Sequence, residues 1–206
     1  ALTTLTAQTP QPTTPPVTEG DFIVRNYTFV SGETMAEVKL HYRTLGTAQK
    51  GADGRVMNAV WIGHGTGGTG AQFLSRNFAG ELFGPGQPLD ATRYFIILPD
   101  HIGHGASSKP SNGLRAKFPK YGYRDMVDLQ YRLITEGLGV NHMRLVMGTS
   151  MGGMHTWLWA QRFPDGFVPR FETTMNWSAS LHARSVQSTD ISFDMALDLL
   201  TAQSLL

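Results

Sequence analysis

The sequence contains no cysteine in 206 residues. A chain without thiols has no disulfide, no thiolate metal site and no cysteine nucleophile. It also lacks an excess of charge, because 17 Lys and Arg residues stand against 16 Asp and Glu and give a formal net charge of +1. Neither a basic stripe nor a run of like charges is present, so we expect no nucleic-acid partner.

Long apolar runs are absent as well. None approaches the roughly 18 residues that a membrane-spanning helix requires, so we expect no membrane span. Apolar residues make up 41% of the chain and charged residues 16%, which is typical of a globular protein. A chain of this length is expected to bury one substantial core.

Residues 1–19 differ in composition from the rest of the chain. They hold seven threonines and four prolines and almost no hydrophobic periodicity, which predicts a disordered or extended tail. We therefore place the folded domain at residues 20–206. Residues 1–7 resemble the end of an export signal, which favours a periplasmic or secreted protein over a cytoplasmic one, although no charged segment precedes them.

The domain alternates short apolar runs with segments of helical spacing. Strands are expected at residues 22–30, 38–45, 58–62, 94–98 and 143–147. Helices are expected at residues 73–82, 123–139 and 151–163. This order predicts an α/β fold with a mostly parallel sheet, helices on both faces and an N-terminal antiparallel hairpin. A further strand is expected at 171–180, and residues 190–206 have the helical spacing of the start of a lid.

A G-x-S-x-G sequence joins the strand at 143–147 to the helix that follows it. It consists of Gly148, Thr149, Ser150, Met151 and Gly152. A serine on such a strand-to-helix turn is held in a strained conformation that exposes its hydroxyl beside the positive end of a helix dipole. Ser150 is therefore the candidate nucleophile. Gly148 and Gly152 are expected to be glycine because a Cβ would crowd the turn, and Thr149 is a candidate pocket residue.

An acyl-transfer site also needs N–H donors for the oxyanion of its tetrahedral intermediate. The backbone N–H of Met151 is one candidate, since it follows the nucleophile. The loop at residues 64–68 follows an earlier strand and is rich in glycine. We nominate the Thr66 N–H as the second donor, with Gly65 as the alternative and Gly67 as a further pocket residue.

The same loop fits the dinucleotide-binding pattern G-x-G-x-x-G through Gly63, Gly65 and Gly68. This alternative is less favoured, because the acid that would bind the ribose, Asp100, comes about 30 residues after the loop rather than about 20. A P-loop is excluded, since no Gly-Lys-Ser/Thr follows. The sequence thus predicts no cofactor.

The histidines are expected to serve the structure. His101 and His104 have i, i+3 spacing, but no third ligand with convincing spacing lies near them, so we expect loop packing and no metal. His155 lies near two tryptophans on the helix that follows the G-x-S-x-G turn, which we call the elbow. This position predicts that His155 is buried. His64 is expected to order its own loop by hydrogen bonding.

Several longer segments together resemble the α/β-hydrolase fold, and within it the homoserine O-acetyltransferase-like branch. They are Asp100-x-x-Gly103-x-Gly105-x-Ser107 and residues 121–127, 130–133, 137–140 and 145–154. The resemblance covers about residues 22–165 and implies an acyl-serine mechanism with Ser150 as the nucleophile. Homoserine acetyltransferases carry His-Ala-Leu-Thr-Gly where this chain has residues 64–68, so the chain is more similar to members of the branch described as α/β-fold hydrolases.

The resemblance implies an enzyme that acts on a small-molecule ester or acyl donor, as a serine ester hydrolase or acyltransferase. Two alternatives stay open: homoserine O-acetylation from acetyl-CoA, and a non-catalytic binding relative that lacks the base. An exported protein would favour hydrolysis, since acetyl-CoA is a cytosolic acyl donor.

The triad partners of Ser150 are not found in this sequence. The fold orders its triad as Ser, acid and His, and only His155 and His182 follow the serine. His155 is too near the elbow, and the acids that precede His182 are Asp165 and Glu172. A makeshift pair of Asp194 with His182 is a minor alternative. The resemblance places acid and base beyond residue 206.

We therefore expect that the C-terminal part of the fold is missing from this sequence. The chain is then a fragment, a partner of a complementary C-terminal chain, a homodimer subunit or a degenerate relative.

Overall fold

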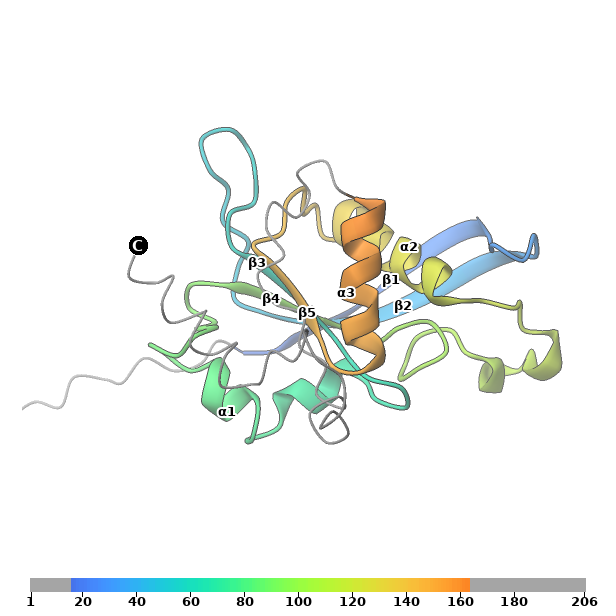
Figure 1. The fold of residues 1–206 in the computed structure, drawn as a ribbon, viewed down its shortest axis with the longest axis horizontal. Helices are drawn as coiled ribbons and strands as arrows, with labels where there is room; N and C mark the ends of the chain where they lie inside the picture. The colour runs from blue at the N-terminus through green and yellow to red at the C-terminus, as the bar shows by residue number, and fades with distance from the viewer. Residues whose placement is uncertain (1–15, 164–206) are drawn as a thin grey trace, which may run out of the picture.

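The computed structural model describes residues 16–163 of the chain. Five strands in this range form one sheet in the order β1-β2-β4-β3-β5 (Figure 1). The strand expected at 171–180 and the lid segment expected at 190–206 lie outside the described residues. No helix within residues 16–163 is long and apolar enough to cross a membrane.

The N-terminal hairpin consists of β1 (Thr18–Thr28) and β2 (Thr34–Leu45), which pair antiparallel. β1 begins two residues before the expected start of the domain, because Thr18 already pairs with Thr44. The connecting turn uses Gly32 at φ +85°, a conformation that glycine adopts without steric cost. β2 also pairs antiparallel with β4, so the hairpin forms one margin of the sheet, as predicted.

The centre of the sheet is parallel and short. β3 (Ala59–Gly63), β4 (Phe95–Pro99) and β5 (Leu145–Gly148) are buried along their whole length, and β3 pairs in parallel with both of the others. Continuous apolar strands of this kind need cover on both faces. The carboxyl ends of the three strands meet at one edge, which brings their following loops together.

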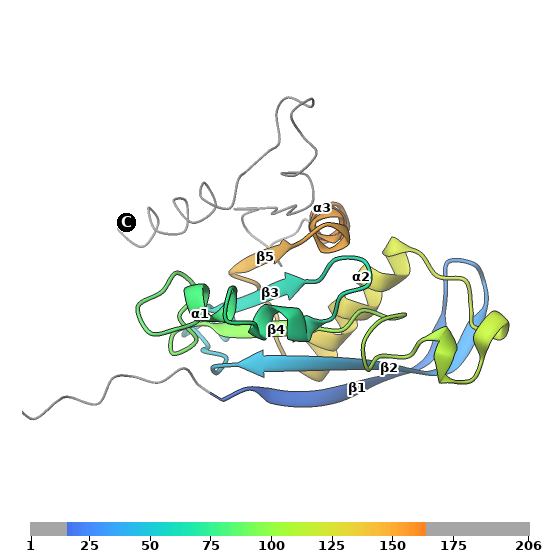
Figure 2. The same ribbon diagram turned by 90° about the horizontal axis from the view of Figure 1, so that it is seen from below.

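Helical segments cover both faces of the sheet, as expected. One face packs against a 3₁₀ turn, η1 (Gly70–Leu74), and against α1 (Ala79–Leu82). The other face packs against α2 (Tyr123–Arg132) and α3 (Met151–Arg162). Figures 1 and 2 show the strands lying between these two groups. A third cluster joins the β1–β2 hairpin to the side of α2.

The helix expected at residues 73–82 does not form as one element. The 3₁₀ turn ends at Leu74, the backbone of Ser75 after it is extended (φ −63°, ψ 153°), and α1 begins only at Ala79. The carbonyl of Ser75 accepts the N–H groups of Phe78 and Ala79 and closes a turn between the two. Serine and asparagine compete with helix formation through local hydrogen bonds, and Gly80 adds a further weakness.

The helix expected at residues 123–139 is confirmed but changes its winding. α2 ends at Arg132, and the chain continues through one π-helical turn at Leu133–Gly137. The N–H of Leu138 donates to the carbonyl of Leu133, which closes the wider turn at 3.0 Å.

Candidate active site

Ser150 lies where β5 turns into α3, at the carboxyl edge of the sheet. Its φ of +51° and ψ of −114° place a non-glycine residue in a sparsely populated region, which costs on the order of 1–3 kcal/mol and needs support from its surroundings. The turn is held by bonds from the Thr149 N–H to the Gly63 carbonyl (3.0 Å) and from the Gly152 N–H to the Thr149 carbonyl (2.9 Å).

The hydroxyl of Ser150 does not cap its own helix. Serine is among the preferred N-cap residues because its oxygen accepts an N–H of the first turn, but no side-chain cap bond forms at Ser150. The residue is half-buried. Within the described residues, the hydroxyl oxygen of Ser150 therefore forms no bond that caps α3.

The elbow glycines are required by close backbone packing. A Cβ on Gly152 would lie 2.1 Å from the carbonyl oxygen of Gly63, and a Cβ on Gly148 would lie 2.3 Å from the carbonyl carbon of Gly152. Both neighbours are backbone atoms, which cannot turn aside. The steric reason given for these glycines from the sequence therefore holds in the structure.

The glycine-rich loop at residues 64–68 lies directly against the elbow. A Cβ on Gly65 would lie 3.2 Å from the Cβ of Ser150. Thr66 and Gly67 are exposed, and Gly67 has a φ of +76°. The Gly68 N–H donates to the carbonyl of Gly65 (3.0 Å) and closes the turn.

The two nominated oxyanion donors are unengaged. Within the described residues, neither the Thr66 N–H nor the Met151 N–H donates to another group. Met151 opens α3, and the first N–H groups of a helix have no partner inside it. The Met151 side chain is buried in the core cluster that includes Ile102 and Met126, which fixes the backbone that carries this N–H.

A residue that the sequence analysis did not single out links the loop region to the elbow. The side-chain amide of Gln72, in η1, donates to the hydroxyl of Thr149 at 3.3 Å. The oxygen of the same amide lies 2.2 Å from where a Cβ on Gly68 would be. Gln72 thus packs against both segments that border Ser150. Gln72 precedes the helix expected at residues 73–82, and a single glutamine there carries no sequence signal for such a contact.

His64 orders the loop, as expected, and its tautomer follows from its partners. Nε2 accepts the backbone N–H of His101 (3.0 Å), so Nδ1 carries the proton and donates to the Gly65 carbonyl (2.8 Å). Burial lowers the pKa of His64 to about 4. The ring is therefore neutral near pH 7 and links Gly65 of the loop to the backbone of His101.

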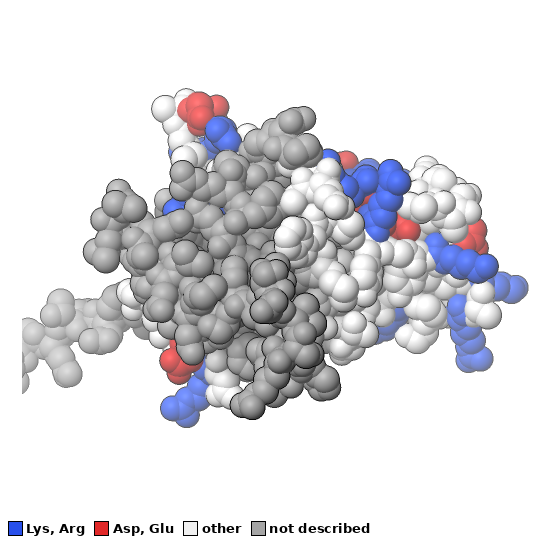
Figure 3. All heavy atoms as spheres, in the orientation of Figure 1, with Lys and Arg blue, Asp and Glu red and all other residues white. Residues whose placement is uncertain are grey.

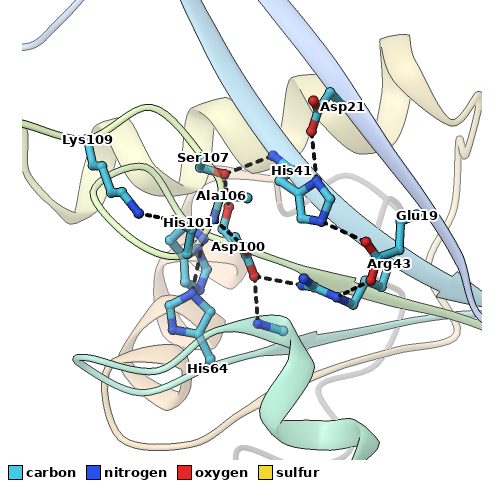
Figure 4. A network of polar contacts seen from close by, with 12 residues as sticks. Glu19, Asp21, His41, Arg43, His64, Asp100, His101, Ala106, Ser107 and Lys109 are labelled. Atoms are coloured by element: carbon cyan, nitrogen blue, oxygen red, sulfur yellow. Dashed lines mark hydrogen bonds and ion pairs between the residues drawn. The ribbon is translucent and has the colours of Figure 1, made fainter. Parts of the chain in front are cut away.

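Asp100 is the buried anchor of the loops at this edge (Figure 4). Its Oδ1 accepts the Gly70 N–H (2.8 Å) and pairs with the Arg43 guanidinium (3.1 Å). Its Oδ2 accepts the Ala106 N–H (2.8 Å). With both oxygens occupied and the side chain 1% exposed, Asp100 has no oxygen to offer a ribose. The less favoured dinucleotide interpretation therefore lacks its acid.

Four histidines form a contiguous group behind the loops. The ring centroids of His64 and His101 lie 4.4 Å apart, those of His64 and His104 5.0 Å, and those of His101 and His155 4.7 Å. His101 and His155 are fully buried, and none of their ring nitrogens has a hydrogen-bond partner among residues 16–163. Burial lowers the pKa of His155 to about 3 and that of His101 well below its usual range. The predicted burial of His155 is confirmed.

These histidines do not assemble a metal site in the described part of the chain. Within residues 16–163 no group of three or more His, Cys, Asp or Glu side chains could hold a metal ion. His155, the only histidine between Ser150 and the end of that range, packs edge-on against His101 and Tyr123. His182, Asp165 and the other acids considered as triad partners lie outside the described residues.

The model of a family described as alpha/beta hydrolase fold matches residues 58–169. The chain is 35% identical over 145 residues to a probable acyltransferase of Methanothermobacter thermautotrophicus, in an alignment that covers 70% of this chain and 44% of that protein. It is 35% identical over 149 residues to a homoserine O-acetyltransferase of Pelobacter propionicus, covering 67% and 40%.

Solved structures of a hydrolase and of an acetyltransferase are also similar to this chain. An acetylester hydrolase from Corynebacterium glutamicum is similar with a TM-score of 0.63 and 29% identity, over 73% of this chain and 42% of that one. A homoserine O-acetyltransferase from Bacillus anthracis is similar with a TM-score of 0.60 and 27% identity, over 78% and 46%. The chain spans less than half the length of each of these four proteins.

Proposed function

This chain belongs to the alpha/beta hydrolase fold family, and on that basis we propose that it carries the nucleophile and the oxyanion-binding part of a serine ester hydrolase or acyltransferase. The main support for the proposal is the backbone conformation of Ser150. Ser150 is a non-glycine residue at φ +51° between β5 and α3, and its hydroxyl takes no part in capping the helix. Strain of this kind is characteristic of a nucleophile elbow.

In the proposed mechanism the Ser150 oxygen attacks the carbonyl carbon of an ester. The Ser150 proton passes to a histidine base, and the carbonyl π electrons move onto the oxygen. The N–H groups of Met151 and Thr66 stabilise this oxyanion, and each such donor is worth about 3 kcal/mol of the barrier. The intermediate then collapses, the C–O bond to the leaving alcohol breaks, and the alcohol leaves with the proton.

The acyl-serine that results is resolved by water or by a second alcohol. We place the histidine base and its orienting acid outside residues 1–206, in a C-terminal segment or in a complementary chain. Without the base, Ser150 is a poorly activated alcohol. The substrate is a small-molecule ester or acyl donor, and the reaction requires no cofactor.

Hydrolysis is the favoured outcome of the deacylation step. The loop at residues 64–68 departs from the His-Ala-Leu-Thr-Gly sequence of homoserine acetyltransferases. A periplasmic or secreted location, which the composition of residues 1–19 favours, would also separate the protein from cytosolic acetyl-CoA. Homoserine O-acetylation is the second candidate, and the 35% identity to a homoserine O-acetyltransferase supports it.

The decisive experiment is labelling with a fluorophosphonate, carried out on the protein isolated from its source after its intact mass has been measured. We expect stoichiometric labelling at Ser150, none in Ser150→Ala, and normal labelling in the control Ser75→Ala, which removes an exposed serine outside the site. Folded protein that stays unlabelled would support the non-catalytic relative. Turnover of p-nitrophenyl acetate, compared with turnover of acetyl-CoA plus homoserine, then separates hydrolase from acetyltransferase.

A further inference from the structure

The near-neutral net charge of the chain conceals a local imbalance between β4 and α2. Residues 109–124 contain five basic side chains and no acidic one. The five are Lys109, Arg115, Lys117, Lys120 and Arg124. Two short 3₁₀ turns, Pro110–Asn112 and Arg115–Lys117, carry this segment along the surface. Apolar and small residues separate the five, so they form no continuous basic stripe along the sequence.

The fold places this segment beside the tip of the β1–β2 hairpin. The Val30 N–H donates to Oδ1 of Asp125 (2.8 Å), and the Lys120 N–H donates to Oε2 of Glu33 (2.8 Å). Both segments lie at one end of the molecule in Figures 1 and 2. Figure 3 shows blue side chains gathered over that end. We call this surface, formed by residues 29–34 and 109–124, the basic end.

Apolar side chains project from the same surface. Val30 is 63% exposed, Leu114 is 42% exposed and Tyr123 is 40% exposed. Val30 lies in the hairpin turn and Leu114 between the two 3₁₀ turns, so both sit on projecting turns. Exposed apolar residues that share a surface with several cations are typical of proteins that bind the interface of an anionic membrane.

Most cations of the basic end lack a carboxylate partner. Arg115, Lys117 and Arg124 form no ion pair with any residue from 16 to 163. On the adjoining strands the pattern is the opposite, since Arg25 pairs with Glu37 and Lys39 with Asp21.

The position of Arg124 is also electrostatically unfavourable. It stands in the first turn of α2, where the helix dipole disfavours a positive charge. Only one exposed acid, Glu33, lies in the basic end, and it accepts the Lys120 N–H and the Ser31 hydroxyl. The cations are therefore available to an anionic partner.

We propose that the basic end docks the protein on an anionic phospholipid surface, with Val30 and Leu114 entering the headgroup region and the cations contacting the phosphates. Several Lys and Arg side chains near an anionic membrane give attraction that adds up over the charges and is screened by salt. The hairpin extends past the carboxyl end of β4, since Tyr42 pairs with Pro99 and residues 34–41 run beyond it. The docking surface thus lies toward the same edge of the sheet as Ser150. The proposal does not depend on the proposed chemistry.

The test is co-sedimentation of the 206-residue chain with phosphatidylcholine vesicles prepared with or without phosphatidylglycerol. We expect binding to the anionic vesicles only, and weaker binding as salt is raised. Lys117→Glu combined with Arg124→Glu should weaken binding at least about tenfold, because each cation near the surface contributes about fivefold. Leu114→Ser should weaken it less and leave the salt dependence intact.

The matched control is Lys50→Glu combined with Arg144→Glu. It makes the same change in net charge at exposed positions away from the basic end, and Arg144 stands before β5 at the opposite edge of the sheet. This variant should bind nearly as the parent does, with circular dichroism verifying that all variants are folded. Equal binding to neutral vesicles, equal loss in the control, or binding to heparin without binding to vesicles would each overturn the proposal.

Discussion

The carbonyl oxygen of Gly63 lies 2.1 Å from the position that a Cβ on Gly152 would occupy. Strand β3 and the first turn of α3 therefore meet with no side chain between them. This contact, together with the bond from the Thr149 N–H to the same carbonyl oxygen, supports the positive φ of Ser150. The geometry of the candidate nucleophile is thus set by a residue far away in the sequence.

Gly152→Ala should disrupt both stability and activity. A methyl group would press on the backbone of β3, which cannot move without disturbing the sheet, so we expect a loss of about 3 kcal/mol or more. Urea denaturation measures it. Gly80→Ala is the control, because its Cβ would meet only the flexible Arg76 side chain at 3.5 Å and alanine favours the helix. If Gly152→Ala left the free energy of unfolding unchanged, the close contact between Gly152 and the Gly63 carbonyl would be refuted.

Gly65→Ala should affect chemistry more than folding. Its Cβ would lie 3.2 Å from the Cβ of Ser150, so the loop would shift by a few tenths of an ångström. We expect less than about 1 kcal/mol of lost stability but roughly tenfold slower fluorophosphonate labelling, since small misplacements near a reacting atom are costly. Unchanged labelling would remove the loop from the proposed oxyanion site.

Asp100→Asn should be strongly destabilising although Asp100 does no chemistry in the proposed mechanism. The substitution removes the buried charge that faces the partly buried Arg43 and turns one acceptor into a donor beside the N–H groups of Gly70 and Ala106. Breaking a buried pair of this kind costs about 3–5 kcal/mol.

Glu37→Gln provides the comparison for Asp100→Asn. Glu37 and its partner Arg25 are both more than half exposed, and an exposed pair contributes at most about 1 kcal/mol. Thermal denaturation of the two variants measures the difference. Equal, small changes in both would mean that Asp100 does not anchor the loops.

Acid should destabilise the fold through its buried histidines. The pKa of His64 is lowered to about 4 and that of His155 to about 3, whereas an unfolded histidine titrates near 6.5. Between these values the unfolded chain binds more protons than the folded one. Stability is therefore complete above about pH 7 and falls as the pH drops toward 4 and 3.

The measurement is the free energy of unfolding in urea at pH 7.5 and at pH 5. His155→Phe keeps an aromatic ring against His101 and Tyr123 but removes one titrating group, so the loss between the two pH values should shrink by about 1–2 kcal/mol. An unaltered pH dependence would show that His155 titrates normally and is hydrated.

The elements that sequence analysis predicted well share a strong local signal. The apolar runs at residues 58–62, 94–98 and 143–147 correspond to β3, β4 and β5. Short continuous apolar runs bounded by glycine or proline are typical of buried strands. The hairpin also followed from its pattern. The helix expected at residues 73–82 was wrong, since Ser75 and Gly80 weigh against a periodicity that rests on only a few apolar residues.

The strand-to-helix turn at Ser150 was predictable from local residues, because a G-x-S-x-G sequence between an apolar strand and a helix is typical of a nucleophile elbow. The contacts that hold this turn in place could be seen only in the three-dimensional structure. Asp100 became the anchor of three segments, and Gln72 reached Thr149, through contacts between residues far apart in the chain. The basic end also depends on a contact between distant residues, since the Val30 N–H at the tip of the hairpin donates to Asp125 at the start of α2. Local steric rules can be read along a chain, whereas such contacts depend on which buried faces pack together, and that is settled only when the whole sheet has formed.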